Sequence, residues 1–235
     1  MARISRKELK TDEFAAEVSK TVEFVQTNRQ RLIAAGVVVA VLVIVGGGGY
    51  TWYTKRAEGA SEALGNAMRT YHAPVRPVSL SDAPGELVFG TDNQRATQAL
   101  TEFQAVADKY SWMRVGKTAQ YYAGLCQTTL GNLPEAEKQL NAVASSSDSF
   151  VAPLAKMALA NLYARENKTA QAQQLYQDLI DHPSDSLPKA TAQLALAEFL
   201  QPTKPAEADK IFKDVAASNP GPDVAELIAK ARQGK

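Results

Sequence analysis

A long stretch without charge, residues 32–54, constrains this chain of 235 residues more than any other feature. The stretch contains no Asp, Glu, Lys or Arg, and it is bracketed by Arg31 and Lys55. At about 1.5 Å of rise per residue, a helix of this length crosses a hydrocarbon core of roughly 30 Å. Aromatic rings that favour the headgroup region cluster at its C-terminal end, at Tyr50, Trp52 and Tyr53. The sequence therefore predicts a transmembrane helix over 32–54.

A cleaved signal peptide is the competing interpretation of this stretch. The leader of 31 residues is long and the apolar core exceeds a typical signal-peptide core, which favours a retained anchor. No Cys follows the stretch closely, which disfavours a lipoprotein. The four glycines at 46–49 have two interpretations: a surface for close approach of a partner helix, or a tolerated weak spot near the outer interface.

The segment before the anchor, 1–31, indicates the orientation in the membrane. It carries seven basic residues, against three in the 20 residues after the anchor. This bias predicts a cytoplasmic N-terminus in the inner (plasma) membrane and an extracytoplasmic remainder. A short amphipathic helix is also expected in the segment, capped by Thr11 or Asp12. Its apolar stripe suits a partner helix or self-pairing, and consists of Phe14, Val18, Val22 and Val25.

Charge and residue types exclude several functional classes. The whole chain has 26 basic and 25 acidic residues, so the part after the anchor is close to neutral and lacks the footprint of a nucleic-acid binder. A single Cys126 and two histidines, His72 and His182, provide no metal-site spacing and no nucleophile beside a base. We therefore expect no catalytic residue, no cofactor and no metal site.

Self-similarity with a period of about 36 residues follows the anchor. In two units, Gly124 is followed by Ala136 and Ala160 by Ala172 at the same spacing, and a large apolar residue comes one turn later. Small residues at these positions let the two helices of a hairpin approach closely, and stacked hairpins bury the remaining faces. The residues predicted to form this packing are Gly124, Ala136, Ala160, Ala172, Ala197, Ala208 and Phe212.

These spacings resemble those of the tetratricopeptide repeat family. Tyr163 and Pro220 also match, whereas the early aromatic residue of each first helix and a closing Pro at Asp148 are missing. The resemblance implies an all-α protein: an N-terminal transmembrane helix followed by a tetratricopeptide-like α-solenoid of three to four helix hairpins. The expected organisation is a cytoplasmic segment with an amphipathic helix, the transmembrane helix, a continuing helix with a Pro-rich insertion, and the repeat domain, at 1–31, 32–54, 55–92 and 93–235.

Stacked hairpins form a curved groove lined mainly by the first helix of each pair. Counted from the small packing residues, the predicted polypeptide-binding groove consists of Thr118, Tyr121, Leu125, Met157, Asn161, Leu194 and Glu198. The alternative for Tyr121, Leu125 and Leu194 is burial between repeats. The few charges among these positions favour an extended apolar polypeptide over a charged tail.

The order of leader, anchor, insertion and repeats resembles the single-pass family of ancillary subunits of the Sec translocon. The resemblance implies a periplasmic repeat domain whose protein partners are the translocon and membrane-bound chaperones. Two other hypotheses remain open. One is a self-associating, homo-oligomeric scaffold of the cell envelope; the other is an enzyme whose site is assembled from carboxylates such as Glu198 and Asp181.

Overall fold

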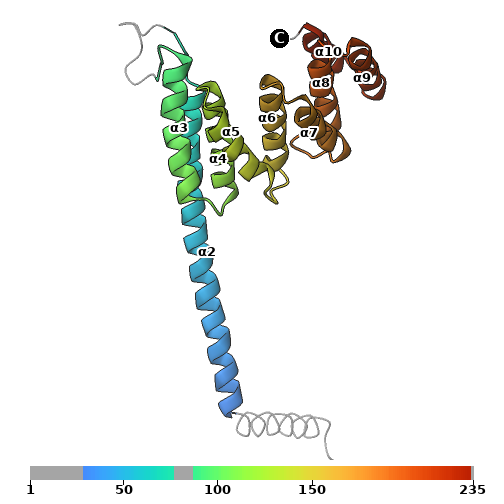
Figure 1. Ribbon diagram of the computed structural model, residues 1–235. Coiled ribbons are helices and arrows are strands. Elements are labelled where there is room, and N and C mark those ends of the chain that lie inside the picture. Colours follow the sequence, from blue (N-terminus) through green and yellow to red (C-terminus); the bar gives the residue numbers. More distant parts are fainter. Residues whose placement is uncertain (1–28, 77–86, 234–235) are drawn as a thin grey trace, which may run out of the picture. The chain divides into compact units, whose positions relative to one another are not determined.

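The structure is a computed structural model that describes residues 29–76 and 87–233. The predicted leader helix and most of the Pro-rich insertion lie outside the described residues. The chain divides into two compact units between Glu58 and Gly59. The described helices, labelled as in Figure 1, are α2 (Arg29–Tyr71), α3 (Asp92–Lys109), α4 (Arg114–Thr129), α5 (Leu133–Ala144), α6 (Val151–Arg165), α7 (Thr169–Asp181), α8 (Lys189–Leu200), α9 (Pro205–Ser218) and α10 (Pro222–Gln233).

The first unit, up to Glu58, is the apolar part of α2. Its valines and isoleucines are exposed, with Ile44 at 72%. Among the described residues, α2 is the one helix long and apolar enough to cross a membrane, and none of its apolar window is buried in protein. Near the end of this unit, the guanidinium of Arg56 lies 5.4 Å from the centre of the Trp52 ring. One candidate membrane helix near the N-terminus is therefore present.

The second unit, from Gly59 onward, is a stack of helix pairs. Helices α4 and α5, α6 and α7, and α8 and α9 pack as hairpins, and each hairpin contacts the next through α5 with α6 and α7 with α8. Helices α4 and α6 also touch, so the first helices of successive pairs line one side. The part of the chain that the structure describes contains no strand, only an isolated bridge between Val75 and Phe89. The predicted all-α solenoid is confirmed.

The small residues of the repeat lie where the helices of a pair meet. A Cβ added to Gly124 of α4 would stand 2.7 Å from Cγ of Leu140 in α5. Leu140 is fully buried, so its side chain has no free space into which it could move away from an added methyl group. The other predicted packing residues are at most 2% exposed, namely Ala136, Ala160, Ala172, Ala197, Ala208 and Phe212.

The C-terminal part of α2 packs against α3 as an earlier hairpin. The Thr70 hydroxyl donates a hydrogen bond to Glu102 at 2.7 Å, and the rings of Tyr71 and Phe103 lie 6.0 Å apart. The insertion between these helices is closed at its base, where the Arg76 N–H donates to the Phe89 carbonyl at 2.9 Å. The C-terminal part of α2 and α3 thus form a further helix pair ahead of α4, and the predicted domain bounds remain predictions.

Turns within successive hairpins share one backbone geometry. Gly131, between α4 and α5, has a φ of +78°, and Asn167, between α6 and α7, has a φ of 58°. In both turns the following N–H donates to a carbonyl in the last turn of the first helix, Asn132 to Gln127 at 2.9 Å and Lys168 to Tyr163 at 2.8 Å. This is the usual helix end with a left-handed residue, for which Gly and Asn are best suited.

Helix α10 covers the C-terminal end of the stack. Ile228 and Ala231 are buried against α8 and α9, whereas Leu227 is 51% exposed. The Gln201 amide donates to the Arg232 carbonyl at 3.0 Å, and the Arg232 guanidinium pairs with Asp209 at 3.1 Å. A terminal helix with one polar face keeps the last hairpin covered, as repeat proteins require.

Candidate functional site

A hollow of about 190 Å³ lies between α4 and α6, the first helices of two successive hairpins. It brings together four of the predicted groove residues: Tyr121, Leu125, Met157 and Asn161. Leu154, Ala158 and Leu162 add apolar surface, and Arg165 and Thr128 supply polar groups. The lining therefore combines a mainly apolar floor with a few hydrogen-bonding groups.

The other three predicted groove residues lie elsewhere. Thr118 is half-buried on α4, one turn before Tyr121. Leu194 of α8 is only 9% exposed and belongs to the hydrophobic core, which is the burial that the sequence left open for it. Glu198 keeps an exposed surface, although desolvation of its carboxyl group raises its pKa. Polypeptide binding by any of the seven remains a prediction.

Two aromatic side chains, the buried Tyr176 and the half-buried Tyr122, hold the walls of the hollow in place. The Tyr176 hydroxyl of α7 donates a hydrogen bond to the Asn161 side-chain oxygen at 2.7 Å, which fixes the orientation of that amide. On α4, the Tyr121 ring meets the Tyr122 ring edge-on at 5.0 Å, and Tyr122 in turn stacks on Phe103 of α3 at 5.2 Å. The hollow is thus positioned by contacts that reach into neighbouring hairpins.

The ring of Tyr121 stays neutral over the physiological range. Burial, with the neighbouring Tyr122, raises the pKa of Tyr121 to about 12. A neutral phenol presents both an apolar face and a hydroxyl, the combination that is enriched at protein interfaces. The ring therefore offers the hollow an apolar face and a neutral hydroxyl group.

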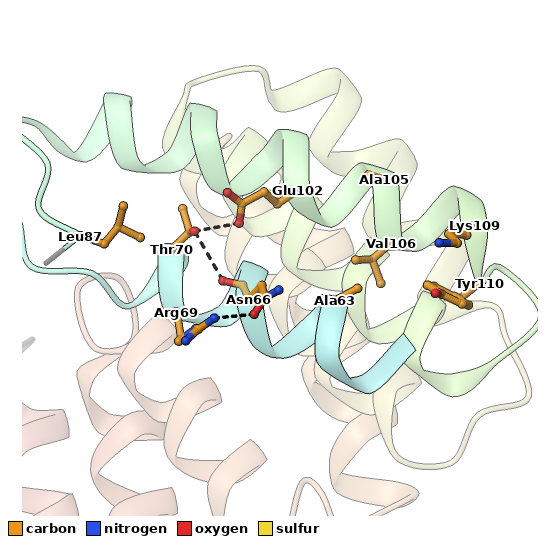
Figure 2. A pocket seen from close by; sticks show the side chains of 10 residues that line it. All are labelled: Ala63, Asn66, Arg69, Thr70, Leu87, Glu102, Ala105, Val106, Lys109 and Tyr110. Carbon is orange, nitrogen blue, oxygen red and sulfur yellow. Dashed lines mark hydrogen bonds between the residues drawn. The ribbon is translucent and has the colours of Figure 1, made fainter. Parts of the chain in front are cut away.

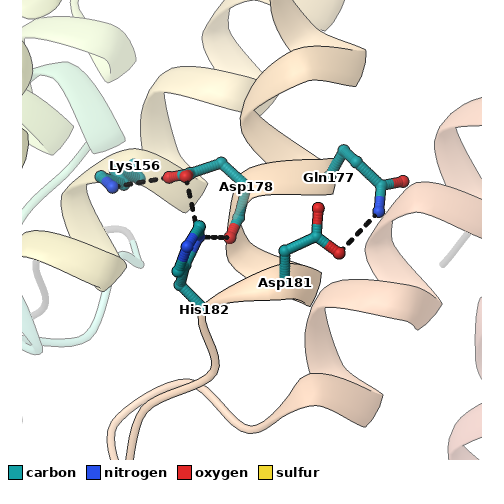
Figure 3. A network of polar contacts seen from close by, with 5 residues as sticks. All are labelled: Lys156, Gln177, Asp178, Asp181 and His182. Atoms are coloured by element: carbon teal, nitrogen blue, oxygen red, sulfur yellow. Dashed lines mark hydrogen bonds and ion pairs between the residues drawn. The ribbon is translucent and has the colours of Figure 1, made fainter.

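A polar network of titratable groups lies at the C-terminal end of α7, beside an open surface (Figure 3). The Lys156 ammonium of α6 lies 2.6 Å from the Asp178 carboxylate, and the His182 ring nitrogen lies 3.1 Å from the same residue. The hydrogen bond from Lys156 lowers the pKa of Asp178, so its carboxylate is ionised and paired. Asp181 points to Gln177, whose amide donates to it at 3.0 Å. The Lys156–Asp178 pair links α6 to α7, and the contact from His182 caps the last turn of α7.

A larger hollow, of about 860 Å³, lies between the C-terminal part of α2 and α3 (Figure 2). Ala63, Ala105 and Val106 form its apolar surface, and Arg69 and Lys109 bring cations to it. None of its lining residues belongs to the predicted groove. The two helices that form it are separated in sequence by the Pro-rich insertion, so the repeat pattern contains no signal for it.

Cys126, on α4, is fully buried. Burial raises the pKa of its thiol to about 12, so the sulfur is held as an unreactive thiol that packs like a small hydrophobic group. Within 29–76 and 87–233, no group of three or more His, Cys, Asp or Glu side chains is placed to hold a metal ion.

A comparison with protein families agrees with this geometry. A family model described as a tetratricopeptide repeat-like domain matches residues 23–178. No curated protein and no solved structure matches the chain. The match covers more than half of the sequence and includes the hairpins α4–α5 and α6–α7 with the hollow between them. The chain therefore belongs to the tetratricopeptide repeat-like domain family.

Proposed function

We propose that this protein is a membrane-anchored adaptor or chaperone-like subunit that binds polypeptide in the groove of its repeat domain. Repeat domains of this family are generally non-catalytic modules for protein–protein interaction. The observation that carries the proposal is the hollow between α4 and α6, which gathers Tyr121, Leu125, Met157 and Asn161. A volume of about 190 Å³ is smaller than a typical small-molecule site and suits an apolar side chain of a bound chain.

The apolar part of α2 is the proposed anchor. Its exposed valines and isoleucines suit lipid, and the basic residues of segment 1–31 favour a cytoplasmic N-terminus. The repeat domain then lies on the extracytoplasmic side of the inner membrane, in the periplasm. The resemblance to ancillary subunits of the Sec translocon makes that machine, with membrane-bound chaperones, the favoured partner and newly exported proteins the favoured clients.

Site-specific photo-crosslinking in cells tests the groove. A photo-crosslinking amino acid at Met157, which is half-buried in the hollow, is expected to capture exported polypeptides or translocon components. The matched control is the same amino acid at Lys138, whose side chain is 76% exposed on the second helix of a hairpin. Equal products from both positions, or none from Met157, would contradict polypeptide binding in this groove.

A topology reporter fused after Lys235 tests the membrane orientation separately. Alkaline phosphatase is active only outside the cytoplasm, and green fluorescent protein folds well only inside it. Phosphatase activity without fluorescence is the expected result. The reverse result would place the repeat domain in the cytoplasm and exclude a periplasmic adaptor. Binding in the groove is tested separately, by the crosslinking experiment.

A self-associating envelope scaffold is the second candidate. It is favoured by the glycines at 46–49, because an added Cβ at each would meet nothing within 4 Å, so a partner helix could approach closely there. Light scattering of the detergent-solubilised chain over a wide concentration range distinguishes the two. A concentration-independent monomer would remove the scaffold, whereas an oligomer lost on replacing the glycines by Leu would support it.

A further inference from the structure

Two large aromatic side chains project from neighbouring loops of the repeat stack. Trp112, between α3 and α4, is 53% exposed, and Phe150, between α5 and α6, is 50% exposed. An ion pair joins the two loops, since Arg114 Nε lies 3.1 Å from the Asp148 carboxylate. We call the surface formed by residues 110–113 and 145–150 the entry rim.

The chain enters the repeat unit at this same rim. A Cβ added to Gly59 would lie 3.4 Å from the hydroxyl oxygen of Tyr110, so the first residue of the unit packs beside the loop that carries Trp112. Gly59 lies four positions after Lys55, the first charge after the apolar stretch. Even a fully extended chain spans only about 14 Å over four residues. The covalent connection between the apolar stretch and the first residue of the repeat unit is therefore short.

The chemistry of the rim suits a lipid headgroup layer. Tryptophan and tyrosine are enriched at membrane–water interfaces, and the apolar stretch already ends in Tyr50, Trp52 and Tyr53. The one charged residue within the rim, Asp148, is paired with Arg114, so the rim presents no unpaired carboxylate to anionic headgroups. The opposite ends of the hairpins, at Gly131 and Asn167, expose no large aromatic residue.

We propose that the entry rim rests on the membrane surface, with Trp112 and Phe150 inserted among the lipid headgroups. This inference rests on the proposed anchoring of α2 and is independent of polypeptide binding in the groove. It gives the repeat domain a second attachment to the bilayer besides its covalent one, and so restricts how the domain can swing about the anchor.

The two tryptophans of the chain allow a direct test with the full-length protein. In the W52F variant, Trp112 is the single fluorophore; in the W112F variant, Trp52 is. Each protein is reconstituted into vesicles of three parts phosphatidylethanolamine and one part phosphatidylglycerol, with or without chains brominated near the headgroup. We expect the brominated lipid to quench Trp112 to a fraction comparable with Trp52.

A matched control places the fluorophore at the other end of α4. In a W52F/W112F background, T129W puts an exposed residue about 22 Å along the helix from Arg114. Quenching of Trp112 without quenching of T129W supports the proposal. Quenching of both Trp112 and T129W overturns the proposal. Quenching of Trp52 alone also overturns it, and a protein partner is then the better occupant of the rim. If Trp52 itself is not quenched, the anchoring of α2 fails, and the inference fails with it.

Discussion

At the scale of single residues, close backbone approach decides which positions are irreplaceable. Gly116 is the clearest case, because an added Cβ would clash with the Tyr110 carbonyl oxygen, and backbone cannot move aside as a flexible side chain can. Gly124 meets a side chain instead, Leu140. The repeat spacing predicts Gly124, since its partner recurs in every unit. The repeat spacing contains no signal for Gly116, because its contact is a loop carbonyl that does not recur from unit to unit.

Replacing Gly124 by Ala should destabilise the repeat unit by up to about 2 kcal/mol. Alanine favours helix by about 1 kcal/mol, but the new methyl group would stand 2.7 Å from Leu140, and overpacking costs about 1–3 kcal/mol. Urea denaturation followed by circular dichroism measures the loss. Gly65→Ala is the matched control, because this exposed helical glycine has nothing within 4 Å of an added Cβ, and its replacement should stabilise. A stabilised G124A would show that α4 and α5 can separate without cost.

The left-handed turn at Gly131 gives a second prediction of this kind. Gly131→Ala should lower the free energy of unfolding by about 1 kcal/mol, because a Cβ is unfavourable at a φ of +78° although the space around it is open. Gly131→Asn should lose less, since Asn167 occupies the same turn in the next hairpin at a φ of 58°. Thermal unfolding of the two variants in parallel measures both. An equal loss for Ala and Asn would mean that the left-handed backbone is not the cause.

At the scale of helices, polar contacts fasten one hairpin to the next. The Tyr163 hydroxyl of α6 donates to Glu137 of α5 at 2.8 Å, and Lys168, at the start of α7, donates to the same carboxylate at 3.1 Å. The hydrogen bond from Tyr163, helped by Lys168, lowers the pKa of Glu137. A carboxylate with a lowered pKa stabilises the fold at neutral pH, and this contribution is lost as the pH falls through its ordinary value and then its folded value.

The Y163F variant should therefore be destabilised in a pH-dependent way. At pH 7 we expect a loss of about 1–2 kcal/mol, typical of a hydrogen bond to a charged group. At pH 3, where more of the Glu137 carboxylate is protonated, the difference from the parent protein should shrink. Urea denaturation at both pH values checks this. The control is Y176F, which removes a hydrogen bond to the uncharged Asn161 and should cost the same at both values. A Y163F loss that does not change with pH would contradict the charged contact.

How far the sequence predicts these helices depends on whether a helix and its partner are neighbours along the chain. The hairpins from α4 to α9 are predicted, because 12 or so residues separate small positions that must touch. The hairpin of α2 and α3 is not, because the insertion after Tyr71 breaks the period and hides the pairing of Thr70 with Glu102. For the groove, position in the repeat places Tyr121, Leu125, Met157 and Asn161 together. Leu194 is buried in the core instead, the alternative that the sequence left open for it.

At the scale of the whole molecule, a stack of hairpins has two ends that differ. Helix α10 covers the last hairpin with Ile228 and Ala231, while the first hairpin of the stack carries the wide hollow beside α3. An uncovered apolar end invites stacking with another copy, which is the route by which repeat proteins aggregate. The cap therefore bears on the choice between a monomeric adaptor and a self-associating scaffold.

Placing a charge beneath the cap tests that relation. Ile228→Asp should lower the free energy of unfolding by about 3 kcal/mol, because it removes a buried apolar side chain and puts an unpaired carboxylate in its place, 8% exposed. Undocking of α10 should also make self-association depend on concentration, measured by light scattering in detergent. The neighbouring Leu227→Asp, at a position 51% exposed, should change stability by less than about 0.5 kcal/mol and leave the mass unchanged. If I228D unfolds more easily yet stays monomeric at every concentration, the cap serves stability alone, and any oligomer of the parent protein must form elsewhere, with the glycines at 46–49 as the first surface to alter.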